Sequence, residues 1–183
     1  MALHAGSGPT ATRLVSEIMI PVDRYPLVHP WDTLGHAVSV MVEAELLVGG
    51  QRSLPRVLLV LEKDGGLAGI LRRRDIMRGL EPRFLVTQAM DYRKKLFDVA
   101  VDPNLAELPF DRVVHGIREQ AGRPVRDVMR PVTATIDPEA HIMKAISEMV
   151  ALNQSLIPVV QGGHVLGVIR SVDVFRELAR LLH

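Results

Sequence analysis

Two stretches of this chain repeat the same order of short motifs, and this internal repeat constrains the fold more than any other feature. Val15-Ser-Glu-Ile-Met-Ile-Pro21 is similar to Val125-Arg-Asp-Val-Met-Arg-Pro131, and each is predicted to be a short amphipathic turn ending in Met-x-Pro. Leu27-Val-His-Pro30 is similar to Thr135-Ile-Asp-Pro138, in which an extended stretch ends in a proline that can open a helix. The repeat indicates two similar units that share one core.

A helix with one apolar face is predicted after each proline, because apolar residues recur there at helical spacing. These residues are Leu34, Ala37, Val38, Met41 and Val42 in the first copy, and Ile142, Ala145, Ile146, Met149 and Val150 in the second. Asp137 is predicted to cap the second helix, and Asp32 or Thr33 the first.

A β-hairpin with a glycine turn is predicted after each helix, and each hairpin runs directly into a last helix. The predicted strands are 57–61 and 67–71 in the first copy, and 157–160 and 165–169 in the second. The first copy is longer by ten residues between its proline and its final Asp. The excess lies mainly in 43–56, which is predicted to be a loop or a helix extension.

Each hairpin ends in the pattern Gly-h-h-x-x-x-Asp, seen in Gly69-Ile-Leu-Arg-Arg-Arg-Asp75 and Gly167-Val-Ile-Arg-Ser-Val-Asp173. Together with the earlier motifs, this ordered set resembles a tandem pair of CBS domains, a Bateman module. The resemblance implies an α/β (α+β) fold of two pseudo-symmetric repeats, each a small sheet with flanking helices. The expected organisation is a flexible tail at 1–11, repeats at 12–81 and 123–183, and a linker with short helices at 82–122.

The resemblance implies a stand-alone regulatory module that senses an adenosine-containing ligand in clefts between the repeats. The ligands of the family include AMP, ADP, ATP and S-adenosylmethionine, and its modules commonly form homodimers. Asp75 and Asp173 match the ribose-binding aspartate of the family. The alternative interpretation is that each is a cap or a dipole partner at a helix start. No covalent cofactor is implied, and the regulated protein partner is unknown.

Arg72 and Arg170 stand three positions before these aspartates, where the family usually has a Thr or Ser that donates to phosphate. Each arginine could hold phosphate in bidentate geometry, extend into solvent, or fill the cleft by pairing with its own aspartate. Ser171 lies one position after the usual hydroxyl.

Thr133 lies in the stretch that matches the base-lining segment of the family, and Ile157 and Pro158 match the hairpin positions that face it. Val22 is a first-copy counterpart of these base-lining residues. For each of them, the alternative to contact with a ligand is plain packing in the hydrophobic core. The first copy has an insertion around Asp23–Tyr25 and lacks the hairpin proline. We therefore expect the second repeat to supply the better-preserved pocket.

Composition excludes several functions. The 183 residues contain no cysteine, which removes disulfides, thiol catalysis and zinc–thiolate sites and fits a cytoplasmic location. The longest apolar stretch, 37–48, is too short to span a membrane, so no membrane segment is expected. The seven histidines lack metal-ligand spacing, and neither a nucleophile elbow nor a P-loop is present. The chain is therefore not expected to be an enzyme or to bind a metal.

Two other functions stay open. Arg72 and Arg170 in place of hydroxyls favour a protein-interaction module with degenerate clefts and no nucleotide binding. Residues 72–95 hold eight basic and three acidic residues, a net charge of +5, so RNA or DNA binding is a further candidate function. The net charge of only +1 for the chain, and the alternative of a solvated helix surface, argue against nucleic acid.

Overall fold

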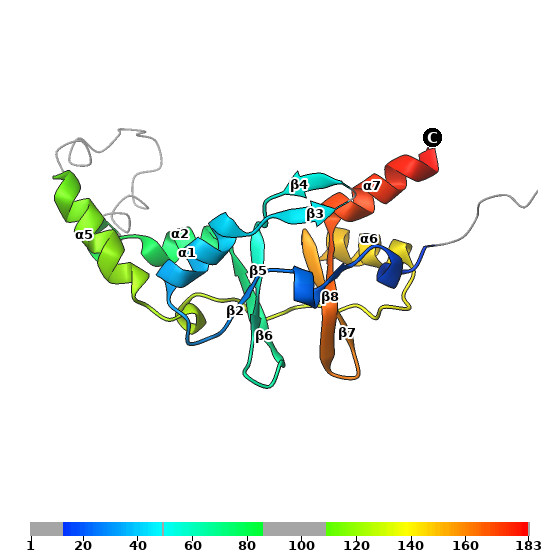
Figure 1. Ribbon diagram of the computed structural model, residues 1–183, viewed down its shortest axis with the longest axis horizontal. Helices are drawn as coiled ribbons and strands as arrows, with labels where there is room; N and C mark the ends of the chain where they lie inside the picture. Colours follow the sequence, from blue (N-terminus) through cyan, green and yellow to red (C-terminus); the bar gives the residue numbers. More distant parts are fainter. Residues whose placement is uncertain (1–12, 49, 86–108, 183) are drawn as a thin grey trace, which may run out of the picture. The chain divides into compact units, whose positions relative to one another are not determined.

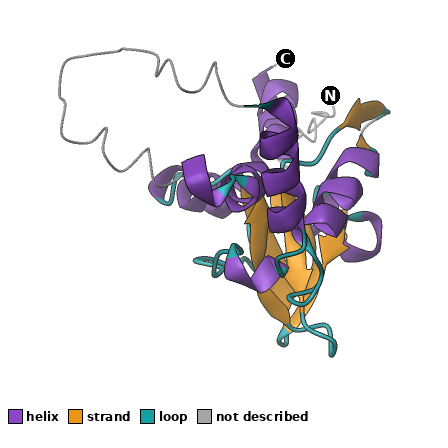
Figure 2. Cartoon of the chain, turned by 90° about the vertical axis from the view of Figure 1, so that its left-hand side faces the viewer, coloured by secondary structure: helices purple, strands orange, loops and turns teal. Residues whose placement is uncertain are grey.

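The structure, a computed structural model, describes residues 13–48, 50–85 and 109–182. The predicted tail at 1–11 and residues 86–108 of the predicted linker lie outside the described residues. Both helices and short strands are present in the described chain (Figures 1 and 2). In the described residues, no helix is both long and apolar enough to cross a membrane.

The chain divides into two compact units, and each contains the opening segment of the other repeat. The first-repeat unit comprises residues 26–132, and the second-repeat unit comprises residues 1–25 and 133–183. Residues 15–21, the Met-x-Pro segment that begins the first repeat, therefore belong to the second-repeat unit. Residues 125–131, which begin the second repeat, belong to the first-repeat unit. We call these two stretches the exchanged segments.

In its described residues, the second-repeat unit contains a three-stranded sheet in the order β1-β8-β7 and two α-helices. Its elements are η1 (Val15–Glu17), β1 (Ile20–Pro21), η2 (Val22–Arg24), α6 (Ile142–Ala151), β7 (Leu156–Gln161), β8 (His164–Arg170) and α7 (Ser171–Leu182). β7 and β8 form the predicted hairpin, and β1 pairs antiparallel with β8, Ile20 lying opposite Val168. Ile136 adds a parallel bridge to Val159 on the other side of the hairpin.

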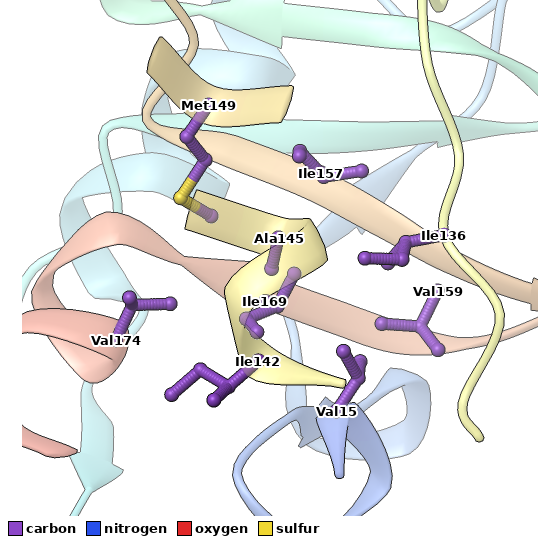
Figure 3. Packing of buried hydrophobic residues seen from close by; sticks show 9 residues of the cluster. All are labelled: Val15, Ile136, Ile142, Ala145, Met149, Ile157, Val159, Ile169 and Val174. Carbon is purple, nitrogen blue, oxygen red and sulfur yellow. The ribbon is translucent and has the colours of Figure 1, made fainter. Parts of the chain in front are cut away.

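The core of this unit lies between the sheet and α6 (Figure 3). It consists of the side chains of Val15, Ile136, Ile142, Ala145, Met149, Ile157, Val159, Ile169 and Val174. Val15 comes from the exchanged opening segment and is fully buried. The hydrophobic core therefore holds that segment in the unit, because removing Val15 from it would expose apolar surface to water.

The first-repeat unit contains a sheet in the order β2-β5-β6 and a separate two-stranded hairpin. Its elements are β2 (Leu27–Val28), α1 (Leu34–Glu43), β3 (Leu46–Val48), β4 (Gln51–Ser53), β5 (Val57–Leu61), β6 (Leu67–Arg72), α2 (Arg73–Leu80), α5 (Phe110–Ala121) and η4 (Val125–Asp127). β2 is parallel to β5, and β5 and β6 form the predicted hairpin. The core includes Val125 of the exchanged segment, together with Leu34, Leu58 and Leu71.

The exchanged segments explain the glycine of the Gly-h-h-x-x-x-Asp pattern. The backbones of Ile70 and Arg130 form an antiparallel bridge with two hydrogen bonds of 3.0 and 2.9 Å, which place Arg130 beside β6. A Cβ atom on Gly69 would lie 2.6 Å from the Arg130 carbonyl oxygen. A Cβ on Gly167 would likewise clash with the Ile20 carbonyl oxygen. Glycine is required at both positions because another backbone approaches closely there.

The two central helices begin later than the prolines suggest. The Thr33 side chain accepts a 3.1 Å hydrogen bond from the His36 amide, so one of the two predicted caps of α1 is confirmed. The predicted Asp137 cap is wrong, because α6 begins at Ile142 and the His141 ring nitrogen Nδ1 accepts from the Met143 amide at 3.1 Å. The Val15 amide donates to the Ala140 carbonyl and the Ile142 amide donates to the Arg13 carbonyl, and these backbone hydrogen bonds hold residues 140 and 141 outside the helix.

Three further details differ from the predictions. Residues 43–56 were expected to form a loop or a helix extension, but they contain the β3–β4 hairpin. Val42 and Val150, expected on the apolar faces, are 70% and 77% exposed. Each stands at the edge of the apolar stripe of its helix, and the two occupy equivalent positions in α1 and α6.

Candidate ligand-binding site

Asp75 lies in the first turn of α2 and is held by two arginines. Arg72 donates to it twice, from Nε to Oδ2 at 2.7 Å and from Nη2 to Oδ1 at 3.0 Å. The Nε of Arg130, from the exchanged segment, donates to Oδ1 at 2.9 Å. The Asp75 side chain is only 3% exposed, whereas the Arg72 and Arg130 side chains are 41% and 45% exposed. One buried carboxylate therefore connects two half-exposed guanidinium groups.

The two arginines keep Asp75 ionised. Burial raises the pKa of the Asp75 carboxyl, but the hydrogen bonds from Arg72 and Arg130 outweigh burial and lower that pKa to about 2. The same contact raises the pKa of Arg72. Hydrogen bonding to the charged form is the expected cause of such a shift in a carboxylate.

Asp173, the equivalent residue of the second repeat, is also held by arginine, but in a more enclosed setting. Arg170 donates from Nε to Oδ2 at 2.7 Å and from Nη2 to Oδ1 at 2.8 Å, and Arg176 Nη1 lies 3.4 Å from Oδ1. The Arg170 and Asp173 side chains are 8% and 3% exposed. The guanidinium of Arg170 is thus buried, whereas that of Arg72 reaches solvent.

Tyr25 forms part of the enclosure of the Arg170–Asp173 pair. It follows η2, which contacts β8, and is only 4% exposed. Burial raises the pKa of the Tyr25 hydroxyl far above its ordinary value, Arg170 opposes the rise electrostatically, and Asp173 adds to it. Tyr25 belongs to the insertion that distinguishes the first copy, and the exchange of segments places this insertion at the second repeat's aspartate.

A pocket of about 460 Å³ opens beside Asp75 in the first-repeat unit. Its lining residues are Asp75, Arg78, Gly79, Arg123, Asp127, Val128, Met129, Arg130 and Pro131. One wall is α2 and the other is the exchanged segment. Gly79 permits this close approach, because a Cβ atom there would lie 2.9 Å from Val128 Cγ1. The volume falls in the range of small-molecule binding sites.

The structure brings the predicted site residues together in pairs. Arg72 pairs with Asp75, and Arg170 pairs with Asp173, so in both repeats the arginine is paired with its own aspartate, as one of the three alternatives required. Val22, the first-copy counterpart of the base-lining residues, lies on η2, which contacts β8 in the second-repeat unit.

The other predicted site residues are spread over the second-repeat unit. Ile157 is fully buried in the core, and Pro158 is buried with its carbonyl accepting from the Ile136 amide at 3.0 Å. Thr133 is exposed and accepts a hydrogen bond from the Gln154 side chain. Ser171 begins α7, and its amide donates to the Ser155 carbonyl at 2.9 Å. Ile157 therefore matches the alternative of plain core packing.

Sequence reasoning missed the arginines that line the pocket, Arg78, Arg123 and Arg130. Arg78 could have been found from its spacing, since a residue three positions after Asp75 shares a face of α2 with it. Arg130 gives no such signal, because it reaches Asp75 only through the exchange of segments. In the described ranges, no group of three or more His, Cys, Asp and Glu residues could hold a metal ion.

The CBS domain model matches the chain at residues 15–82 and 125–180, which together make up more than half of it. The chain therefore belongs to the CBS domain family, and the two matches define it as a tandem CBS-pair regulatory module. No curated protein matches the chain.

Solved structures of CBS-pair proteins share this fold. CBSX2 in complex with AMP matches with a TM-score of 0.61 and 16% identity, over 93% of this chain and 98% of that chain. CBSX2 from Arabidopsis thaliana matches with a TM-score of 0.61 and 18% identity, over 92% and 96%. A CBS domain-containing protein of unknown function from Kribbella flavida matches with a TM-score of 0.63 and 14% identity, over 91% and 98%. These similarities confirm the predicted α+β fold of CBS repeats.

Proposed function

We propose that this regulatory module binds an adenosine-containing ligand in the pocket beside Asp75, in the first-repeat unit. The observation that carries the proposal is the contrast between the two aspartates. Asp75 lines an open pocket of about 460 Å³, whereas the side chains of Asp173 and its partner Arg170 are both buried. The complex of the structurally similar CBSX2 with AMP supports an adenine nucleotide as the ligand class.

The Asp75 carboxylate can take part in binding because its arginines are half-exposed. A carboxylate has about four acceptor sites, and Arg72 and Arg130 occupy three at Asp75. A ribose hydroxyl can use the remaining site. A phosphate can also contact the guanidinium groups of Arg72 and Arg130 while they hold Asp75, because both side chains already reach water.

The same reasoning disfavours the second repeat as the ligand site. A ligand at Asp173 would have to displace Arg170 from a doubly hydrogen-bonded pair whose side chains are 8% and 3% exposed, and breaking a buried ion pair is strongly unfavourable. We therefore expect one ligand per chain, bound at the first repeat.

A second candidate function is a protein-interaction module without nucleotide binding. The observation in its favour is that both aspartates already have arginine partners at hydrogen-bond distance. In that case the ion pairs are structural elements that replace a ligand. The absence of catalysis and a cytoplasmic location also stay predictions.

A homodimer is part of the proposal, with a second copy covering matching helix faces of the two repeats. Val42 and Met77 are 70% and 60% exposed on α1 and α2 of the first repeat. Val150 and Phe175, at the equivalent positions of α6 and α7, are 77% and 73% exposed. Each repeat therefore exposes apolar side chains at equivalent positions of its helices. A second copy of this chain carries the same repeated pattern and can cover both sets.

Calorimetric titration of the full chain with AMP, ADP, ATP and S-adenosylmethionine tests the function. We expect at least one compound to bind with one site per chain, and Asp75→Asn to weaken it about tenfold or more. Asp173→Asn is the matched control and is expected to leave affinity within about twofold where thermal unfolding shows that it is folded. Two sites per chain would contradict the assignment to Asp75, and no binding at millimolar ligand would favour the interaction module.

A further inference from the structure

The pocket beside Asp75 carries an excess of positive charge. Its lining includes Arg78, Arg123 and Arg130 against the two carboxylates of Asp75 and Asp127. Arg72 adds a fourth guanidinium, because it holds Asp75 at 2.7 Å. Four cations therefore face two anions at this site, and the pKa of about 2 for Asp75 means that its charge is constant at neutral pH.

Most of these charges are already engaged with one another. Arg72 and Arg130 hold Asp75, and Arg123 lies 3.6 Å from Asp127. Arg78 is exposed on α2, and in the part of the chain that the structure describes it makes no hydrogen bond or ion pair through its side chain. The excess positive charge of the pocket is therefore most available at Arg78.

Arg78 also has a suitable position for a ligand that rests on Asp75. Residues three apart on a helix lie on the same face, so Asp75 and Arg78 both face the pocket from α2. Arginine presents a planar set of donors that matches the oxygens of a phosphate group in bidentate geometry. A ligand with a nucleoside at Asp75 and a phosphate at Arg78 would thus meet complementary groups at both ends.

We propose that the Asp75 pocket selects phosphate-bearing adenosine ligands and rejects cationic S-adenosylmethionine, with Arg78 as the side chain that binds phosphate. The inference rests on the proposed function, whose ligand class it narrows. A phosphate monoester carries a charge of about −1.5 to −2 at pH 7, which offsets the excess of the pocket. The sulfonium group of S-adenosylmethionine instead adds positive charge beside four guanidinium groups, and like charges repel most strongly where solvent screens them least.

The test is calorimetric titration of the full chain with adenosine, AMP, ADP, ATP, S-adenosylmethionine and inorganic tripolyphosphate. Wild type is compared with Arg78→Gln and with the matched control Arg74→Gln, an exposed arginine one turn earlier on α2 that does not line this pocket. We expect affinity to rise from AMP to ATP and S-adenosylmethionine to bind at least about tenfold more weakly than AMP. Arg78→Gln should weaken the nucleotides by about tenfold or more and leave adenosine unchanged, while Arg74→Gln stays within about twofold.

The outcomes separate this inference from the proposed function. If S-adenosylmethionine binds as tightly as the nucleotides, or if Arg78→Gln affects adenosine and ATP equally, charge selection by Arg78 is wrong while the adenosine site stands. If tripolyphosphate binds as tightly as ATP and adenosine does not bind, the adenosine site is wrong while the anion site stands. If no compound binds, both are overturned.

Discussion

Arg170 and Asp173 form a doubly hydrogen-bonded ion pair whose two side chains are 8% and 3% exposed. The equivalent pair of the first repeat, Arg72 and Asp75, has the same two hydrogen bonds but leaves 41% of the arginine exposed. The repeats therefore place the same chemistry in different environments. One pair is a structural element inside its unit, and the other forms part of a pocket wall.

The two pairs should differ in their contribution to stability. Asp173→Asn leaves the buried Arg170 without its carboxylate and should lower the free energy of unfolding by about 3–5 kcal/mol. Asp75→Asn should lower it by only about 1–2 kcal/mol, because Arg72 and Arg130 can turn into water. Urea denaturation of both variants measures the difference. An equal loss in the two variants would show that exposure of the arginine does not set the cost.

Asp75 also predicts a pH dependence of stability. The pKa of its carboxyl is about 2 in the folded chain, below the ordinary value of 3.8. The stabilisation is therefore fully present above about pH 4 and is lost as the pH falls toward 2. The difference in unfolding free energy between wild type and Asp75→Asn, at most about 2 kcal/mol, should shrink over that interval. A difference that stays constant from pH 5 to pH 2 would contradict the ion-pair assignment.

Gly69 should be intolerant of a side chain, because its Cβ would lie 2.6 Å from the Arg130 carbonyl oxygen. Gly69→Ala should displace the exchanged segment from β6 and cost about 1–3 kcal/mol of unfolding free energy. The control is Gly122→Ala, whose Cβ would meet only the Glu119 carbonyl oxygen at an ordinary 3.6 Å. We expect the control to unfold within about 0.5 kcal/mol of wild type. Equal unfolding midpoints for the two variants would contradict the close approach of the Arg130 carbonyl oxygen to Gly69.

If the chain forms the proposed homodimer, negative charge on the apolar helix faces that carry Val150 and Phe175 should prevent assembly. Val150→Glu combined with Phe175→Glu should convert the dimer to a monomer, because both side chains are about three-quarters exposed in a single chain. Light scattering after size-exclusion chromatography measures the mass. Gln161→Glu, at the exposed end of β7, is the control and should leave the mass unchanged. A wild type that is already monomeric at micromolar concentration would contradict the proposal.

The elements that depend on local patterns were predictable from the sequence. Both hairpins, both central helices and the Thr33 cap follow from alternation, helical spacing and capping preference, which act within a few residues. The family follows from the order of these motifs. The start of α6 was not predictable, because backbone pairing with Arg13 and Val15 delays it, and such pairing leaves no local signal.

The site was predictable only in part for the same reason. Asp75, Asp173 and their arginines were recognised from spacing, but the sequence left three conformations open for each arginine. The structure shows both paired. The expectation that the second repeat holds the better-preserved pocket rested on the insertion around Asp23–Tyr25 in the first copy and on its missing hairpin proline. The exchange of segments instead places Tyr25 in the second-repeat unit with Asp173, and Arg130 at Asp75.

A crystal structure of the chain with ATP at saturating concentration would show where the nucleotide binds. We expect electron density for one nucleotide per chain between α2 and residues 128–131, with its sugar at Asp75, its phosphates at Arg78, and the Arg170–Asp173 pair unchanged. Density at Asp173 with Arg170 displaced would contradict the assignment to the first repeat. Two empty sites at saturating nucleotide would contradict ligand sensing and leave the protein-interaction module in its place.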